Sequence, residues 1–73
     1  MTPQGTAEAL QWFRKAAEKN LPTAQYNLGL MYQTGDGGIQ NYAEAAAWYR
    51  KAADQGLALA QFKMGTLYCL LYT

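Results

Sequence analysis

The chain contains two closely similar copies of one segment. Residues 7–18 (AEALQWFRKAAE) return 36 positions later as residues 43–54 (AEAAAWYRKAAD), and the same offset relates Gln25 to Gln61 and Gly29 to Gly65. A fixed period of this length is typical of solenoid proteins, in which each unit buries its apolar face only against its neighbours. The repetition therefore predicts a stack of similar units and points to no particular chemical activity.

Composition limits the size of the core and the kinds of partner. A chain of 73 residues forms one small domain, for which the free energy of unfolding should be about 4–11 kcal/mol. Six basic and five acidic residues leave a net charge of +1, so the chain has no electrostatic footprint for a nucleic acid. The pairs Arg14-Lys15 and Arg50-Lys51 are interpreted as part of a solvated face rather than as a nucleic-acid site.

Cysteine usage and hydropathy also exclude several classes. The single cysteine, Cys69, excludes an intramolecular disulfide framework and a cysteine-based zinc site. No apolar stretch reaches the roughly 20 residues of a membrane span, and the N-terminus lacks a basic-then-apolar leader. A cytoplasmic protein without a membrane span is the default expectation; the alternative is a piece of a longer exported protein, which would have the same composition.

Apolar residues recur at helical spacing in four segments, separated by residues that end helices. Asn20 and Gly56 occupy equivalent positions where a left-handed residue can close a helix. Pro22 suits the first turn of the second helix, and Asn41 with Glu44 resembles a capping box before the third. We therefore predict an all-α solenoid of four antiparallel helices in a right-handed stack. Its inward positions are Ala9, Trp12, Phe13, Ala16, Ala17; Ala24, Leu28, Met31, Tyr32; Ala45, Trp48, Tyr49, Ala52, Ala53; Ala60, Met64, Leu67, Tyr68 and Leu71.

Several runs together resemble a Sel-1-like repeat, a relative of the tetratricopeptide helix pair. These runs are AQYNLGLMY at 24–32, GDGG at 35–38, YAEA at 42–45 and WYRKAADQG at 48–56. The resemblance implies one Sel-1-like domain over residues 1–73. Within it, 7–19 form a second-type helix without its partner, 23–56 a complete repeat, and 59–73 a first-type helix with an atypical apolar tail. The secreted branch of the family, some members of which resemble β-lactamases, has paired cysteines that this chain lacks.

The aromatic and glycine positions have structural interpretations that compete with functional ones. Trp12 and Trp48, with their aromatic neighbours in the two copies, can be read as an aromatic cage or as core. Because they share a stripe with small alanines, we expect both indoles in the core. Gly29 and Gly65 lie mid-helix, where glycine costs about 1 kcal/mol relative to alanine, so we expect close helix–helix approach at both.

No catalytic or metal-binding constellation is recognisable. The glycine-rich segment at 35–38 lacks the lysine and hydroxyl of a phosphate loop and the oxygen ligands of a calcium loop. The chain has no histidine, which is the commonest general base. We expect no enzymatic activity, no cofactor and no metal.

The resemblance implies that first-type helices line a concave groove that accepts a peptide or protein segment. Asn27 and Lys63 stand where some peptide-clamping relatives hold a carboxylate, which suggests a chain terminus or an acidic side chain as ligand. In the alternative, Tyr26 and Phe62 only pack the two first-type helices together. The predicted peptide-binding residues are Thr23, Tyr26, Asn27, Leu30, Gln33, Leu59, Phe62, Lys63 and Thr66, with Cys69 at the end of the same face.

Three functions follow from this sequence. The favoured one is a non-enzymatic scaffold or adaptor that binds a protein or peptide. The alternative is a structural fragment or cap of a longer array that self-associates through exposed ends, namely the outer face of the first helix and Cys69, Leu70, Leu71 and Tyr72. A β-lactamase-like, penicillin-binding relative is the least favoured, because paired cysteines and catalytic groups are missing.

Overall fold

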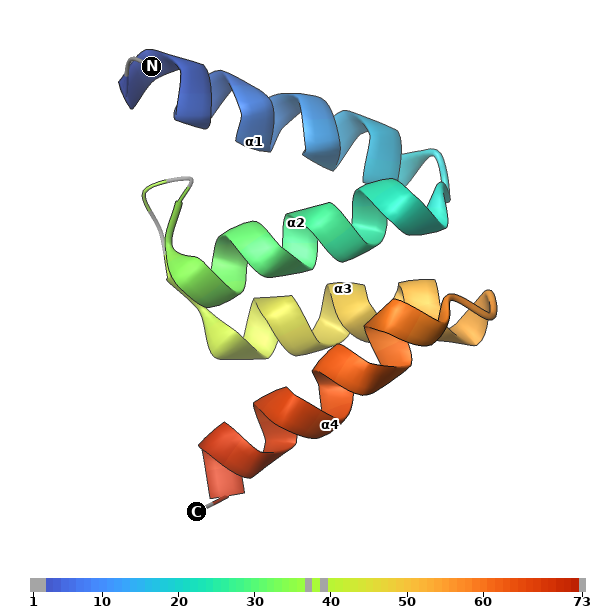
Figure 1. Ribbon diagram of the computed structural model, residues 1–73. Helices are drawn as coiled ribbons and strands as arrows, with labels where there is room; N and C mark the ends of the chain where they lie inside the picture. Colours follow the sequence, from blue (N-terminus) through green and yellow to red (C-terminus); the bar gives the residue numbers. More distant parts are fainter. Residues whose placement is uncertain (1–2, 37, 39, 73) are drawn as a thin grey trace.

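Four helices connected by short turns make up the protein. The computed structural model describes residues 3–36, 38 and 40–72, and these form α1 (Pro3–Glu18), α2 (Pro22–Thr34), α3 (Tyr42–Asp54) and α4 (Ala58–Tyr72). Figure 1 shows α1, α2 and α3 lying side by side in antiparallel order, with α4 crossing α3 at an angle. The predicted all-α helical repeat fold is confirmed. α1 begins at Pro3 rather than at residue 7, and α4 continues through the apolar tail to Tyr72.

The residues that begin and end the helices lie where the sequence predicts, but only half of the capping box before α3 forms, because the backbone N–H of Asn41 donates to the Tyr32 carbonyl at 2.8 Å. Asn20 (φ 68°) and Gly56 (φ 92°) are left-handed at equivalent positions after α1 and α3. Pro22 lies in the first turn of α2, where an N–H would have no intrahelical partner. Asn41 caps α3, because its side-chain oxygen accepts the backbone N–H of Glu44 at 3.1 Å. Such caps fix where each helix starts and therefore how its apolar stripe faces its neighbour.

Successive helices pack on one another, most extensively α2 on α3. The stripes of these helices supply the core, in which Leu28, Tyr49 and Leu67 have no exposed surface. Small residues between them allow close approach. The other buried members of this cluster are Ala17, Ala24, Tyr32 and Ala45.

The two mid-helix glycines differ. A Cβ built on Gly29 would lie 2.6 Å from both Cδ1 and Cε1 of Tyr49 and 3.2 Å from the carbonyl oxygen of Ala45. Only glycine therefore permits α2 and α3 to approach this closely, as predicted. At Gly65 no described atom lies within 4 Å of the added Cβ, so the prediction of close helix–helix approach at this glycine is wrong.

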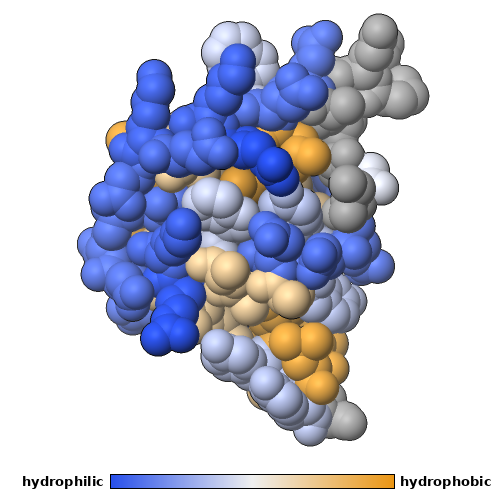
Figure 2. Space-filling model, turned by 180° about the vertical axis from the view of Figure 1, so that it is seen from behind, coloured by the Kyte–Doolittle hydropathy of each residue, from blue (hydrophilic) through white to orange (hydrophobic). Residues whose placement is uncertain are grey.

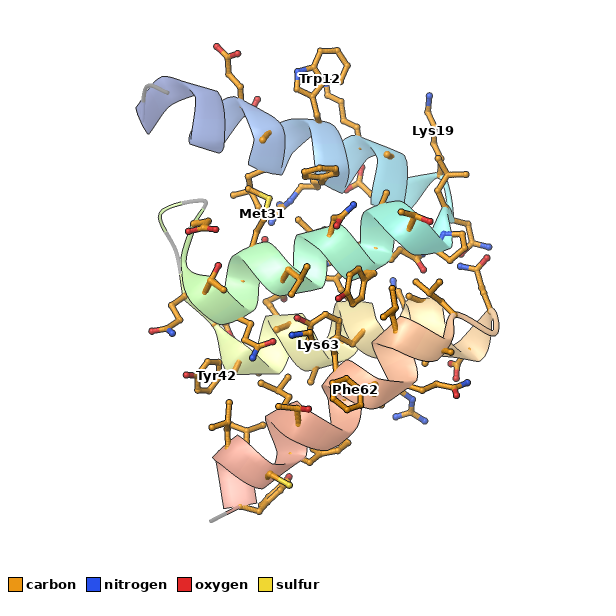
Figure 3. All side chains as sticks on the ribbon, in the orientation of Figure 1. Trp12, Lys19, Met31, Tyr42, Phe62 and Lys63 are labelled. Carbon is orange, nitrogen blue, oxygen red and sulfur yellow. The ribbon has the colours of Figure 1, made fainter. Side chains whose placement is uncertain are left out.

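The expectation that both indoles lie in the core is wrong for Trp12. Its side chain is 71% exposed and points away from α2 (Figure 3). The equivalent Trp48 is half-buried against the core. The reason is that α2 covers this side of α3, whereas no described helix covers the same side of α1. Tyr68 and Leu71, also assigned to an inward stripe, are 40% and 42% exposed at the other end of the stack.

Candidate functional site

The predicted peptide-binding residues all lie on α2 and α4, and none of them is buried. Thr23, Leu59, Phe62 and Thr66 are exposed, and the remaining positions are half-buried. Figure 3 shows Phe62 and Lys63 on the side of α4 that is turned toward the viewer, below α2. The half-buried positions are Tyr26, Asn27, Leu30, Gln33 and Lys63.

Two of these residues also hold α2 against α3. The rings of Tyr26 and Tyr49 lie 5.8 Å apart between centroids, and the Tyr49 hydroxyl donates to Oε1 of Gln33 at 2.7 Å. The alternative in which Tyr26 and Phe62 only pack α2 against α4 does not describe the structure, because Tyr26 lies against Tyr49 of α3 and the Phe62 ring is 70% exposed.

Burial raises the pKa of Tyr49 to about 12, and the neighbouring Tyr26 adds to the shift. The Tyr49 phenol therefore stays protonated at neutral pH and remains a hydrogen-bond donor to Gln33. Tyr49 therefore packs α2 against α3, and it has no exposed surface that a ligand could contact.

A buried glutamine joins the ends of three helices. Gln25 is 1% exposed; its Nε2 donates to the Ala17 carbonyl and to Asn20 Oδ1, each at 3.2 Å. Its Oε1 accepts from Nε2 of Gln55 at 2.9 Å. Sequence reasoning did not assign this role, although a polar residue repeated on an apolar stripe at Gln25 and Gln61 was a usable signal.

The accessible part of the α2–α4 face combines apolar and polar groups. Leu59 and Phe62 are 57% and 70% exposed, and Asn27 and Lys63 add an amide and an ammonium. The Thr66 hydroxyl donates to the Phe62 carbonyl at 3.2 Å, so this group is already engaged within α4. Such a surface can bury an apolar side chain and pair with a carboxylate.

A second accessible surface surrounds Trp12 on α1. The outer face of this helix is one of the two ends predicted to be exposed, although Trp12 itself was expected in the core. Shallow hollows flank the indole, and the Lys15 ammonium lies 6.0 Å from the indole centroid. The corresponding distance from Lys51 to Trp48 is 4.7 Å. The residues lining these hollows are Glu8, Gln11, Trp12 and Lys15 on one side, and Trp12, Lys15, Ala16, Glu18, Lys19 and Leu21 on the other.

The C-terminal part of α4 forms a third surface. Cys69 is exposed, and Leu70 and Tyr72 are 54% and 81% exposed. Figure 2 shows hydrophobic residues at the lower end of the molecule, where this part of α4 lies, and mostly hydrophilic residues above. Tyr68 and Tyr72 lie with ring centroids 6.0 Å apart on this helix.

Neither a metal centre nor a membrane segment can be assigned in the described part of the chain. It holds no group of three or more histidine, cysteine, aspartate or glutamate residues placed to bind a metal. None of its helices combines the length and apolar character that a membrane crossing requires.

Comparison with known proteins identifies the repeat. The Sel1 repeat family model matches residues 1–21, 22–57 and 58–72. A crystal structure of a Sel1 repeat protein from Oxalobacter formigenes is similar, with a TM-score of 0.80 and 52% sequence identity over 84% of this chain. The match covers 25% of that protein, so this chain spans about a quarter of its length. No curated protein gives a significant match. Sel1 repeats are in general protein–protein interaction modules, and the chain belongs to the Sel1 repeat family.

Proposed function

We propose that the chain is a non-enzymatic scaffold or adaptor that binds a peptide segment of a partner protein on the α2–α4 face. The ligand is a segment with one apolar side chain and a carboxylate, either an acidic side chain or a free C-terminus. The single observation that carries the proposal is the exposure of Phe62 and Leu59 beside Lys63 on a helix whose opposite side is buried.

Energetic considerations favour these residues as the contact. When a partner covers a large apolar side chain such as Phe62, the apolar surface removed from water contributes a favourable free energy of about 25 cal/mol per Å². The half-buried Lys63 loses less side-chain freedom on binding than a fully solvated lysine does. A nucleic-acid ligand is not proposed, because the net charge of +1 supplies little attraction to phosphates.

A peptide array tests this proposal. The array presents sequences with free C-terminal carboxylates beside the same sequences with amidated C-termini, and with acidic residues replaced by their amides. We expect retention of carboxylate-bearing peptides by the wild-type chain and loss of that preference with Lys63→Gln.

The matched control is Arg50→Gln, which removes the same charge from an exposed position on α3. It should bind like the wild type. Equal loss with Lys63→Gln and Arg50→Gln would mean that net charge, rather than the α2–α4 face, governs binding. Equal retention of carboxylate and amide peptides by the wild type would contradict the proposed ligand class.

A further inference from the structure

We propose that α4 of one copy of this chain packs on α1 of a second copy, so that copies associate head to tail and repeat the α2–α3 packing. The two surfaces involved are the outer face of α1 and the free face of α4. The first comprises Ala9, Trp12, Phe13 and Ala16. The second comprises Gln61 and Gly65, with Phe62 at the edge that it shares with the α2–α4 face. This inference does not rest on peptide binding by the α2–α4 face.

The internal repeat is the first argument. With the 36-residue offset, α1 corresponds to α3 and α4 corresponds to α2. Within one copy, α2 and α3 form the most extensive helix pair. The outer face of α1 and the free face of α4 are therefore the two complementary halves of a contact that this sequence already makes.

Residues that are buried in the α2–α3 contact have counterparts on α1 and α4 that are more exposed. Ala45, Tyr49 and Ala52 on α3 have no exposed surface, whereas their counterparts on α1 are half-buried. On the other side, Gln25 of α2 is 1% exposed and Gly29 is buried. Their counterparts on α4, Gln61 and Gly65, are exposed.

Gly65 is the most specific feature of the free face of α4. Gly29 leaves room for the ring of Tyr49, which also lies against Tyr26. The counterparts of these three residues are Gly65, Phe13 and Phe62. A second copy in the same geometry places the Phe13 ring over Gly65 and beside Phe62. This contact accounts for a glycine on α4 at a position where, within one copy, nothing lies within 4 Å of an added Cβ.

The polar pairs across α2 and α3 also have compatible counterparts. Tyr49 donates its hydroxyl to Gln33; the equivalent positions hold Phe13, which has no hydroxyl, and Cys69, which has no amide oxygen. The donor and the acceptor are thus lost together.

A second pair keeps its polarity. Gln55 donates to Oε1 of Gln25 at 2.9 Å, and the equivalent positions hold Lys19 and Gln61. The Lys19 ammonium can donate to the Gln61 amide oxygen in the same direction.

A contact between different faces of two copies leaves one of each face uncovered, so the association continues beyond a dimer.

Sedimentation velocity on the 73-residue chain tests the proposal from about 1 µM to about 1 mM, where weak contacts dissociate. We expect the sedimentation coefficient to rise with concentration past that of a dimer. Gly65→Ala adds a methyl group that a single copy accommodates, since nothing lies within 4 Å of it. At the contact it meets Phe13, and an overpacked interface of this kind weakens association by about 5- to 150-fold.

Mixing two variants distinguishes the geometry. Trp12→Glu disables the outer face of α1 at a site that is 71% exposed, and it leaves the free face of α4 intact. Gly65→Ala does the reverse. Each variant alone should stay monomeric where the wild type associates, and their mixture should form a one-to-one complex that grows no further. Circular dichroism should show unchanged helix content for both.

Leu70→Gln is the matched control, because Leu70 is 54% exposed on α4 but corresponds to the exposed Thr34 outside the contact. It should associate like the wild type. A wild-type chain that is monomeric throughout would overturn the proposal. So would association of Gly65→Ala at wild-type strength, or a mixture that forms no complex. Loss of association with Leu70→Gln would also contradict the proposal, because it would show that the copies associate through nonspecific hydrophobic contacts at the C-terminal end of α4.

Discussion

Alanine substitution at the two mid-helix glycines separates helix propensity from packing. In an open helix, Gly→Ala stabilises by about 1 kcal/mol, and Gly65, with nothing within 4 Å of an added Cβ, should show this gain. At Gly29 the added Cβ would lie 2.6 Å from two ring carbons of Tyr49. That ring is fully buried, and its hydroxyl is held by Gln33 at 2.7 Å. It therefore has little freedom to move aside.

The expected magnitudes follow from these contacts. Overpacking of a core costs about 1–3 kcal/mol, which outweighs or cancels the propensity gain at Gly29. Since propensity is common to both sites, the Gly29→Ala chain should be less stable than the Gly65→Ala chain by about 1–3 kcal/mol, the packing term alone. Against a total of about 4–11 kcal/mol this difference is large.

Urea unfolding followed by circular dichroism measures the difference. The chain is kept at about 1 µM so that self-association does not add to its apparent stability. Thermal unfolding should show the same order, with a separation of roughly 4–8 °C for each kcal/mol in a domain of this size. If Gly29→Ala gains as much stability as Gly65→Ala, then the close approach of α2 and α3 is not what requires glycine, and the reasoning is refuted.

Three further predictions concern burial, ionisation and capping. Trp48→Ala should lose up to about 3–5 kcal/mol as a core truncation, whereas Trp12→Ala, at 71% exposure, should change the free energy of unfolding by no more than about 0.5 kcal/mol; comparable losses in urea unfolding would contradict the asymmetry. Because burial raises the pKa of Tyr49 to about 12, its contribution is complete below pH 10 and falls as the pH rises from 10 to 12, at about 1.4 kcal/mol per pH unit. When the free energy of unfolding is measured against pH, the Tyr49→Phe chain should lack this decrease between pH 10 and 12. A decrease as steep as that of the wild type would refute the assignment. Asn41→Ala removes the side-chain cap of α3 and should cost about 1 kcal/mol, checked by thermal unfolding against Asn41→Ser, which should retain most of the cap.

Much of the fold was predictable from the sequence because repeat proteins are built from local contacts. The periodic stripes, the left-handed caps at Asn20 and Gly56, and the cap at Asn41 are encoded within a few residues of where they act. The side of each helix that carries apolar residues follows from spacing alone. The family also follows from short runs in fixed order, such as the segments at 24–32 and 48–56.

Whether an apolar position is covered depends on a neighbouring helix, and spacing within one helix carries no such information. Trp12 and Trp48 lie in nearly identical segments, yet one is exposed and the other half-buried, because α2 covers α3 on that side. Gly29 and Gly65 differ for the same reason. The local sequence thus determined the helices, their caps and their apolar sides. The stacking of α1 to α4 set which of those sides are buried, because burial is a property of two surfaces in contact.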